Sequence, residues 1–183
     1  EMNRLGMLVD ISHVSDATFW DVLETSGKPV FASHSCCRAL CEHTRNMTDE
    51  MVTALGQKGG VTNVTFVSGF VAGQPGSDFK SPVIPPREKL RDPFDYIAWP
   101  CPDPGPPFET LMAQFNHAIK LAGADHVGIG SDYDGMTQTP VGVEDISKLP
   151  RVTEGLLASG HSEAEVRKVL GENNLRLFRE TLG

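Results

Sequence analysis

Two short apolar segments each end in a histidine, and one strand-helix-strand unit separates them. Residues 8–13 read Leu-Val-Asp-Ile-Ser-His and residues 30–34 read Val-Phe-Ala-Ser-His. Both have the length and composition of strands in a buried sheet. Between them, Ser15 followed by Asp16 is typical of a helix start, and Gly-Lys-Pro at 27–29 is typical of a helix end. This order predicts two parallel strands whose carboxyl ends lie at one edge of a sheet.

The same alternation continues along the chain. Alternating Val, Thr, Asn and Phe residues predict a third strand at 61–67, and an apolar run predicts a fourth at 126–130. Periodic apolar residues and helix-start signals, including Ser162-x-x-Glu165, predict helices at about 15–25, 48–58, 108–122, 152–158 and 162–180. We therefore expect an α/β fold with about four parallel strands and flanking helices.

Four strands are compatible with two architectures. They could be half of a (β/α)8 TIM barrel, which has eight strands, or a small open doubly wound sheet. The first strand is not followed by a glycine-rich phosphate loop, and this favours the half barrel. A chain of 183 residues with 39% hydrophobic residues predicts a single domain over 1–183.

One segment interrupts the alternation. Residues 68–107 contain ten of the thirteen prolines and little periodicity. A connection of this length is uncommon in a compact domain and is usually an active-site lid or a disordered insert. Because the segment follows a strand, it should leave the sheet at the edge where the two histidines lie, and we expect a lid.

Charge and composition exclude several classes of partner. The formal net charge is −8 and the basic residues are scattered, which argues against binding to nucleic acid or to an anionic membrane. No apolar run approaches the ~18 residues of a membrane span. The four cysteines lack zinc-finger spacing, so we expect free thiols and leave a Cys41–Cys101 disulfide open.

Three residues at predicted strand ends suggest metal chemistry. His13 and His34 each follow a serine at the end of consecutive strands, and Asp132 follows the fourth strand. Imidazole nitrogens suit zinc, and a nearby carboxylate can accept a proton during hydrolysis. We assign Asp134 and Gly135 to a turn, and Asp10 to a structural role. The pattern predicts a metal-dependent hydrolase with His13 and His34 as ligands and Asp132 as the catalytic acid–base.

The remaining charged and imidazole side chains give weaker signals. From the sequence pattern alone, Arg45 reads as a solvated surface charge. Outside the strand ends, the other histidines read as structural or solvated residues: His43, His117, His126 and His161. The pattern therefore gives no further candidate ligand.

Four ordered motifs resemble a known family. They are residues 3–15, residues 29–35, Arg45-Asn46 and residues 126–135, and the likeness extends to the closing Glu-Asn-Asn-Leu-Arg-Leu-Phe segment. Together they resemble the membrane (renal) dipeptidase family, which are binuclear zinc dipeptidases on an amidohydrolase-type (β/α)8 barrel. The resemblance identifies the chain with the carboxyl-terminal half of such an enzyme. Because bacterial relatives are often soluble, the resemblance also implies the cytoplasm as the default location.

The resemblance implies a role for each candidate. His13 and His34 would bind one of two zinc ions, and Asp132 would orient the nucleophilic hydroxide and shuttle its proton. Arg45 would bind the terminal carboxylate of a dipeptide substrate. The family's His-x-Asp ligand pair has no counterpart, because no His-x-Asp occurs in this sequence. The isolated chain would then hold an incomplete site.

Three functions remain open at this point. The first is a zinc dipeptidase, incomplete as an isolated chain, that hydrolyses dipeptides. The second is a non-catalytic remnant or split half that works only by association with another chain. The third is a different amidohydrolase that acts on cyclic amides or esters. A half sheet would expose unpaired edges, so we expect either self-association or pairing with a missing amino-terminal half.

Overall fold

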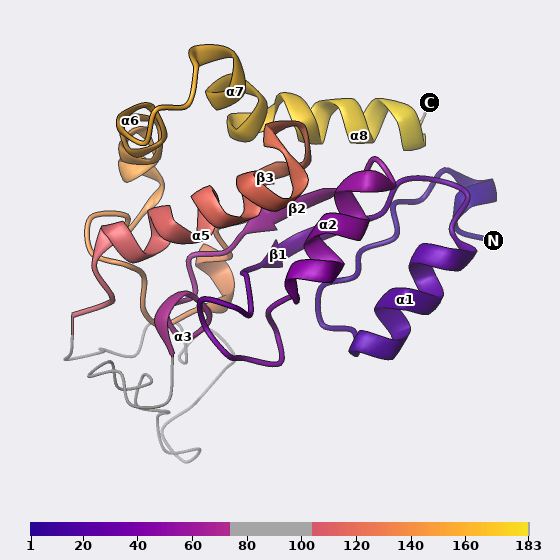
Figure 1. Ribbon diagram of the computed structural model, residues 1–183, viewed down its shortest axis with the longest axis horizontal. Coiled ribbons are helices and arrows are strands. Elements are labelled where there is room, and N and C mark those ends of the chain that lie inside the picture. The colour runs from indigo at the N-terminus through magenta and orange to yellow at the C-terminus, as the bar shows by residue number, and fades with distance from the viewer. Residues whose placement is uncertain (74–103, 183) are drawn as a thin grey trace.

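The computed structural model describes residues 1–73 and 104–182, and this part of the chain is an α/β fold (Figure 1). Its sheet is parallel, with the order β1-β2-β3. The strands are β1 (Phe31–Ser35), β2 (Val61–Val64) and β3 (Val127–Ile129). The predicted α/β class and parallel pairing are confirmed. The described residues form three strands, so the expectation of about four is wrong for this part of the chain.

The strand predicted at residues 8–13, the segment that ends at His13, is not a strand in the structure. It runs beside β1 and forms one isolated parallel bridge, between Asp10 and Phe31. In a continued ladder the backbone N–H of Ser33 would donate to this segment's backbone. It donates instead to the Asp10 carboxylate, at 3.0 Å. A local side-chain acceptor thus replaces the ladder, and the chain turns away at His13.

The helices lie close to their predicted ranges. Ser15, Thr48 and Ser162 each accept a backbone N–H in the first turn of the helix that follows, as the start signals predicted. The α-helices are α1 (Asp16–Thr25), α2 (Asp49–Gln57), α3 (Ser68–Ala72), α5 (Phe108–Ala122), α6 (Pro150–Ala158), α7 (Glu163–Arg167) and α8 (Asn173–Leu182). Short 3-10 turns are η1 (Asn3–Leu5), η3 (Ala124–His126), η4 (Tyr133–Gly135) and η5 (Ile146–Lys148).

The last predicted helix is not continuous. A π-helical segment, η6 (Lys168–Glu172), separates α7 from α8 and contains Gly171 with non-helical dihedral angles. Its last turn leads into Asn173, whose side chain donates to the backbone oxygens of Ala124 and Val127. The break therefore brings the start of α8 to the amino-terminal end of β3.

The core lies between the sheet and the helices α2 and α5. These two helices pack against each other and against β2 (Figure 1). Phe66, which follows β2, lies edge-on to Phe115 of α5 with ring centroids 6.5 Å apart, and both are fully buried. Burial of each such side chain stabilises the fold by about 1.5–3 kcal/mol. This packing gives the carboxyl ends of the strands a rigid base.

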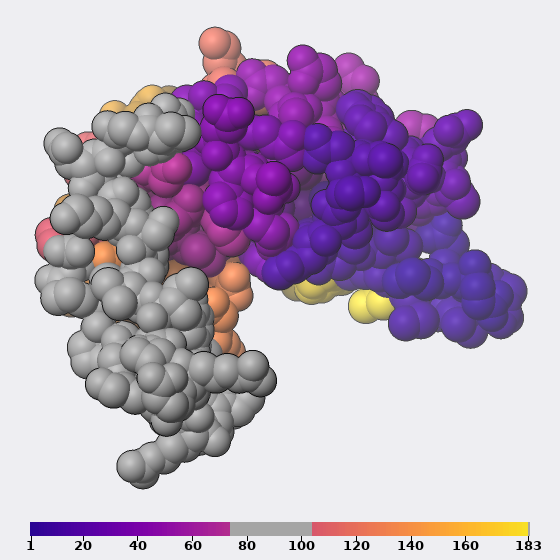
Figure 2. All heavy atoms as spheres, turned by 90° about the horizontal axis from the view of Figure 1, so that it is seen from below, coloured from indigo at the N-terminus to yellow at the C-terminus, as the bar shows by residue number. Residues whose placement is uncertain are grey.

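Both ends of the described chain lie at one end of the molecule (Figure 1), and Figure 2 shows the face that carries the N-terminal segment and α1. Lys28 Nζ donates to the backbone oxygen of Glu180 in α8 at 3.1 Å. Apolar side chains are exposed on these terminal segments, namely Met2, Leu5, Met7, Leu175 and Leu182. Within residues 1–73 and 104–182, no helix has the length and apolarity to cross a membrane.

Two predictions fall partly outside the described residues. Of the expected lid at 68–107, the structure describes α3 and the residues from Pro104 onward, so the lid and the single domain stay predictions. Cys36, Cys37 and Cys41 carry free thiols, as expected, and Cys101 lies outside the described residues.

Candidate metal centre

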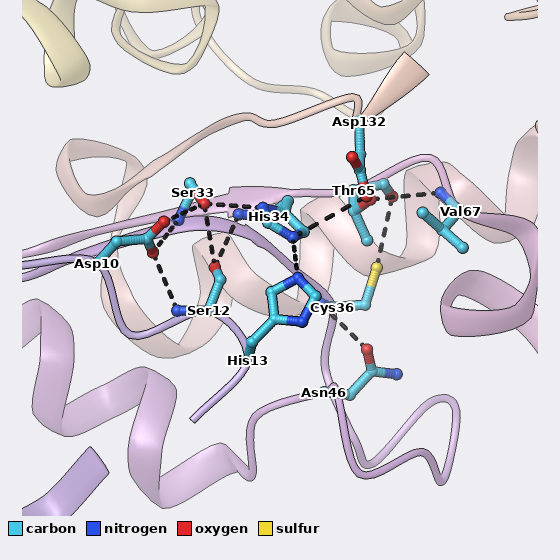
Figure 3. Close-up of polar contacts among 10 residues, drawn as sticks. All are labelled: Asp10, Ser12, His13, Ser33, His34, Cys36, Asn46, Thr65, Val67 and Asp132. Atoms are coloured by element: carbon cyan, nitrogen blue, oxygen red, sulfur yellow. Dashed lines mark hydrogen bonds and ion pairs between the residues drawn. The ribbon is translucent and has the colours of Figure 1, made fainter. Parts of the chain in front are cut away.

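The structure brings three of the predicted site residues together beyond the carboxyl ends of the strands (Figure 3). His34 lies in β1, His13 lies in the turn after the segment beside β1, and Asp132 is the N-cap residue of η4, after β3. The parallel strands carry these side chains to one edge of the sheet because their carboxyl ends coincide. Residues far apart in sequence therefore meet at one point.

The two imidazole rings face each other through their Nε2 atoms. His13 Nε2 and His34 Nε2 lie 2.8 Å apart, and Asp132 Oδ2 lies 4.0 Å from His34 Nε2 (Figure 3). Two imidazole nitrogens beside a carboxylate are a donor set that suits zinc. Among the residues that the structure describes, no cluster of three or more His, Cys, Asp or Glu side chains has the geometry to hold a metal. The two imidazoles are thus candidate ligands with a carboxylate nearby.

The backbone at this site is unusual. His13 and Asp132 have φ angles of 71° and 64°, in the left-handed region that L-residues rarely adopt. Gly135 leaves room for the Asp132 side chain, because a Cβ there would overlap the carboxylate. A Cβ at Gly130 would overlap the backbone oxygen of Ser33. Gly130 therefore allows the chain after β3 to approach Ser33, the residue before His34, closely.

A polar network lies behind His34 (Figure 3). Its Nδ1 atom lies 2.7 Å from Ser33 Oγ, which in turn hydrogen-bonds to Asp10 Oδ2. The other oxygen, Asp10 Oδ1, accepts the backbone N–H groups of Ser12 and Ser33. Partial burial alone would raise the pKa of Asp10, but these hydrogen bonds outweigh it, so the pKa lies below its ordinary value. Asp10 is therefore an ionised acceptor at neutral pH.

Arg45 belongs to the same electrostatic environment. Burial lowers its pKa, while the charges of Asp132 and Asp10 partly offset that effect. Burial also lowers the pKa of His13, with further contributions from Arg45 and His34. The guanidinium lies 5.4 Å from the ring centroid of Phe70. Its Nε and Nη2 atoms are buried without a hydrogen-bond partner in the described chain.

The simple interpretation of Arg45 as a solvated surface charge is wrong. Two of its donors are shielded from solvent because Arg45 packs over Phe70 of α3. Buried donors without partners cost free energy, about 1–3 kcal/mol each, so they are rare outside functional sites. These donors are available to an anionic group.

Sequence reasoning missed the side chains that support Arg45. Asn46 is buried, and its Nδ2 donates to the backbone oxygens of Cys41 and Phe70 at 2.9 and 2.8 Å. His43 packs against Phe70 with ring centroids 4.6 Å apart, and its Nδ1 accepts the backbone N–H of Arg45. Nothing in the local sequence pattern indicates these long-range contacts to α3.

The other histidines have structural partners, as expected. His117 pairs with Asp49 at 2.9 Å, and His126 Nδ1 contacts the Gly60 backbone oxygen at 2.8 Å. His161 Nε2 lies 2.9 Å from Asn116 Oδ1. Asp134 lies exposed in η4, in agreement with the predicted turn.

Comparison with known families assigns the chain. The sequence model described as membrane dipeptidase (peptidase family M19) matches residues 1–182. The chain belongs to the membrane dipeptidase family. A similar curated relative is the uncharacterized dipeptidase C965.12 of Schizosaccharomyces pombe, 38% identical over 182 residues. The match covers 99% of this chain and 37% of that relative.

Solved structures of similar proteins share the fold. A metallopeptidase from Rhodobacter sphaeroides, liganded with a phosphinate mimic of the dipeptide L-Ala-D-Ala, is 28% identical with a TM-score of 0.77. The match covers 98% of this chain and 44% of that one. The probable dipeptidase PvdM from Pseudomonas aeruginosa is 26% identical with a TM-score of 0.79, covering 99% and 52%. This membrane dipeptidase family member thus spans about half the length of these structures.

Proposed function

We propose that this chain supplies part of the active site of a zinc-dependent dipeptidase. The observation that carries the proposal is the 2.8 Å approach of His13 Nε2 and His34 Nε2, with Asp132 beside them, in a member of the membrane dipeptidase family. A carboxyl-terminal half of a (β/α)8 barrel accounts for the parallel sheet and for the site at the strand ends.

His13 and His34 are the residues that would hold zinc. Both present Nε2 to the same point, and imidazole nitrogen is a favoured zinc ligand. When bound, the metal supplies Lewis-acid polarisation of the scissile carbonyl and activation of water. A catalytic zinc site usually has three protein ligands, so two imidazoles alone should bind it weakly. A complete site with two zinc ions, as the family resemblance implies, needs ligands beyond this pair.

Asp132 is positioned to move a proton. Its carboxylate lies 4.0 Å from His34 Nε2 and its side chain is about one quarter exposed. A carboxylate there can accept a proton from the attacking water and pass it to the leaving amine. In the variant Asp132→Asn, the amide has nearly the shape of the carboxylate but cannot accept the proton. This variant should therefore lose turnover while it preserves the fold.

Arg45 is the residue proposed to bind the substrate carboxylate. Its unpaired Nε and Nη2 atoms form one edge of the guanidinium, which can donate two parallel hydrogen bonds to a carboxylate. A dipeptide has such a carboxylate one residue from the scissile bond. The dipeptide mimic bound to the Rhodobacter sphaeroides relative supports the same substrate class here.

The test compares a dipeptide with its carboxyl-terminal amide, using zinc and this chain paired with the amino-terminal half of a membrane dipeptidase, which supplies the remaining ligands. We expect hydrolysis of L-Ala-D-Ala, little hydrolysis of its amide, and loss of activity in Asp132→Asn. The variant Arg45→Ala should raise KM for the dipeptide and remove the discrimination against the amide. Equal hydrolysis of dipeptide and amide by the unaltered chain would exclude the Arg45 role and favour another amidohydrolase activity.

A second candidate function is that of a split half that acts only with another chain. One observation favours it: the described residues hold no cluster of three or more metal donors. The exposed apolar residues of η1 and α8 offer a surface for such pairing. Association with the amino-terminal half without bound zinc and without dipeptide hydrolysis would support a non-catalytic role over the first function.

A further inference from the structure

Three side chains form a continuous hydrogen-bonded chain that ends at the metal site. Asp10 Oδ2 contacts Ser33 Oγ, Ser33 Oγ lies 2.7 Å from His34 Nδ1, and His34 Nε2 faces His13 (Figure 3). Asp10 comes from the segment beside β1, whereas Ser33 and His34 are consecutive in β1. This series of hydrogen bonds therefore links the Asp10 carboxylate, through Ser33, to His34, a proposed metal ligand.

Counting protons along this chain fixes the direction of each hydrogen bond. A carboxylate only accepts, so the contact between Asp10 and Ser33 requires the Ser33 hydroxyl to donate. The hydroxyl has one hydrogen, so Ser33 Oγ can only accept from the imidazole. His34 must then carry its proton on Nδ1, which leaves a lone pair on Nε2. That lone pair faces His13 Nε2, which lies 2.8 Å away.

We propose that Asp10 and Ser33 are positioning residues that hold His34 in its Nδ1-protonated tautomer, with Nε2 ready to bind a metal. The inference rests on the proposed zinc site and deepens it. Metal-binding histidines commonly donate their second ring nitrogen to a carboxylate or carbonyl, and here a serine hydroxyl relays the carboxylate. Ser12 adds to the same cluster, because its Oγ accepts the backbone N–H of His34 at 3.0 Å.

A purely structural role for Asp10 is the competing explanation. Its Oδ1 accepts two backbone N–H groups, from Ser12 and Ser33, and so fastens the segment to β1. These contacts do not involve the imidazole. The two roles thus use different oxygens of one carboxylate, and substitutions can separate them.

The variant Asp10→Asn separates them most sharply. Its amide oxygen can keep the two backbone contacts of Oδ1, which places the NH2 group against Ser33 Oγ. The amide would then donate to Ser33, whose hydroxyl would turn and donate to His34 Nδ1. The imidazole proton would move to Nε2 and block the ligand atom. A near-isosteric change is therefore expected to invert the tautomer of His34.

Nitrogen NMR of the metal-free chain with 15N-labelled histidine, at about pH 8 where free imidazole is neutral, reads the tautomer directly. We expect His34 to be protonated on Nδ1 in the unaltered chain and in Ser33→Thr, which keeps the hydroxyl. We expect mixed tautomers in Ser33→Ala and Nε2 protonation in Asp10→Asn. His126 is an internal reference, because its Nδ1 contacts the Gly60 carbonyl, which only accepts. Nε2 protonation of His34 in the unaltered chain would overturn the proposal.

Zinc affinity gives the second readout. Ser33→Ala should weaken zinc binding by about 10-fold or more, and Ser33→Thr should restore it. Lower thermal stability in Ser33→Ala with an unchanged tautomer would show a structural role and refute the proposal. If the unaltered chain binds no zinc while His34 is protonated on Nδ1, the zinc site fails and the positioning inference stands, so the two failures are distinguishable.

Discussion

His13 and Asp132 share a left-handed backbone conformation, although 119 positions separate them in the chain. Among the non-glycine residues that the structure describes, these two have positive φ angles. Such conformations cost free energy in L-residues and cluster at functional sites, where the surrounding structure enforces them. Both side chains lie beside His34, His13 at 2.8 Å and Asp132 at 4.0 Å from its Nε2 atom.

The left-handed backbone of Asp132 predicts which of two substitutions leaves the fold more stable. Glycine adopts a left-handed conformation without strain, so Asp132→Gly should be more stable than Asp132→Ala by about 1 kcal/mol. Both variants lose the carboxylate and should lose activity. Urea unfolding of the two variants measures the difference. Equal free energies of unfolding would contradict the assigned backbone conformation.

The close approach of Gly130, which follows β3, to Ser33 of β1 gives a second prediction. Gly130→Ala would drive a methyl group into the Ser33 backbone oxygen, and we expect a loss of about 1–3 kcal/mol in the free energy of unfolding. Gly69 is the matched control, because it lies in α3 with open space around its Cβ position. Gly69→Ala should be neutral or stabilise the fold by about 0.5–1 kcal/mol. A Gly130→Ala variant as stable as the control would be inconsistent with this packing.

The ion pair between Asp16 and Arg38 predicts a pH dependence. Arg38 donates to both carboxylate oxygens, at 2.6 and 2.8 Å, and these hydrogen bonds hold the pKa of Asp16 below its ordinary value. A lowered folded-state pKa means that the pair stabilises the fold above about pH 3.9, the unfolded value, and loses this effect as the pH falls.

Asp16→Asn should therefore be less stable than the unaltered chain at neutral pH, and the difference should shrink in acid. Thermal unfolding across this pH range measures it. Because Asp16 is half exposed, we expect a modest effect. A difference that grows as the pH falls would have the wrong sign for this pair.

Asn46 gives the largest predicted loss of stability near the site. Its amide joins the loop after β1 to α3 through Cys41 and Phe70, and its Oδ1 accepts the backbone N–H of Cys36 at 3.3 Å. Asn46→Ala leaves these buried groups unpaired, at about 1–3 kcal/mol for each unpaired group. Denaturant unfolding should show this loss, whereas Asn116→Ala, at a more exposed site, should cost less. Similar losses in both variants would argue against the role of Asn46.

Much of the fold could be predicted from local patterns. The caps at Ser15, Thr48 and Ser162 act through contacts within one turn, so their helices begin where the sequence indicates. The first strand could not be predicted correctly, because the Asp10 side chain competes for a ladder hydrogen bond from a residue 23 positions away. The break at Gly171 likewise serves a tertiary contact of Asn173.

The candidate site was only partly visible in the sequence. Strand ends located His13, His34 and Asp132, because parallel strands bring their carboxyl ends together. The burial of Arg45 depends on Phe70, which lies in a helix outside every motif. The serines before both histidines were visible in the sequence, but the role of Ser33 requires the Asp10 contact that folding creates.

The most direct test of the zinc site follows the imidazole 15N resonances of the metal-free chain during titration with zinc. We predict that the Nε2 signals of His13 and His34 shift together and saturate at one zinc per chain, while those of His117, His126 and His161 stay unchanged. The shift of either site histidine should disappear when the other is replaced by alanine. Independent shifts of the two histidines, or no shift at either, would contradict a shared zinc site.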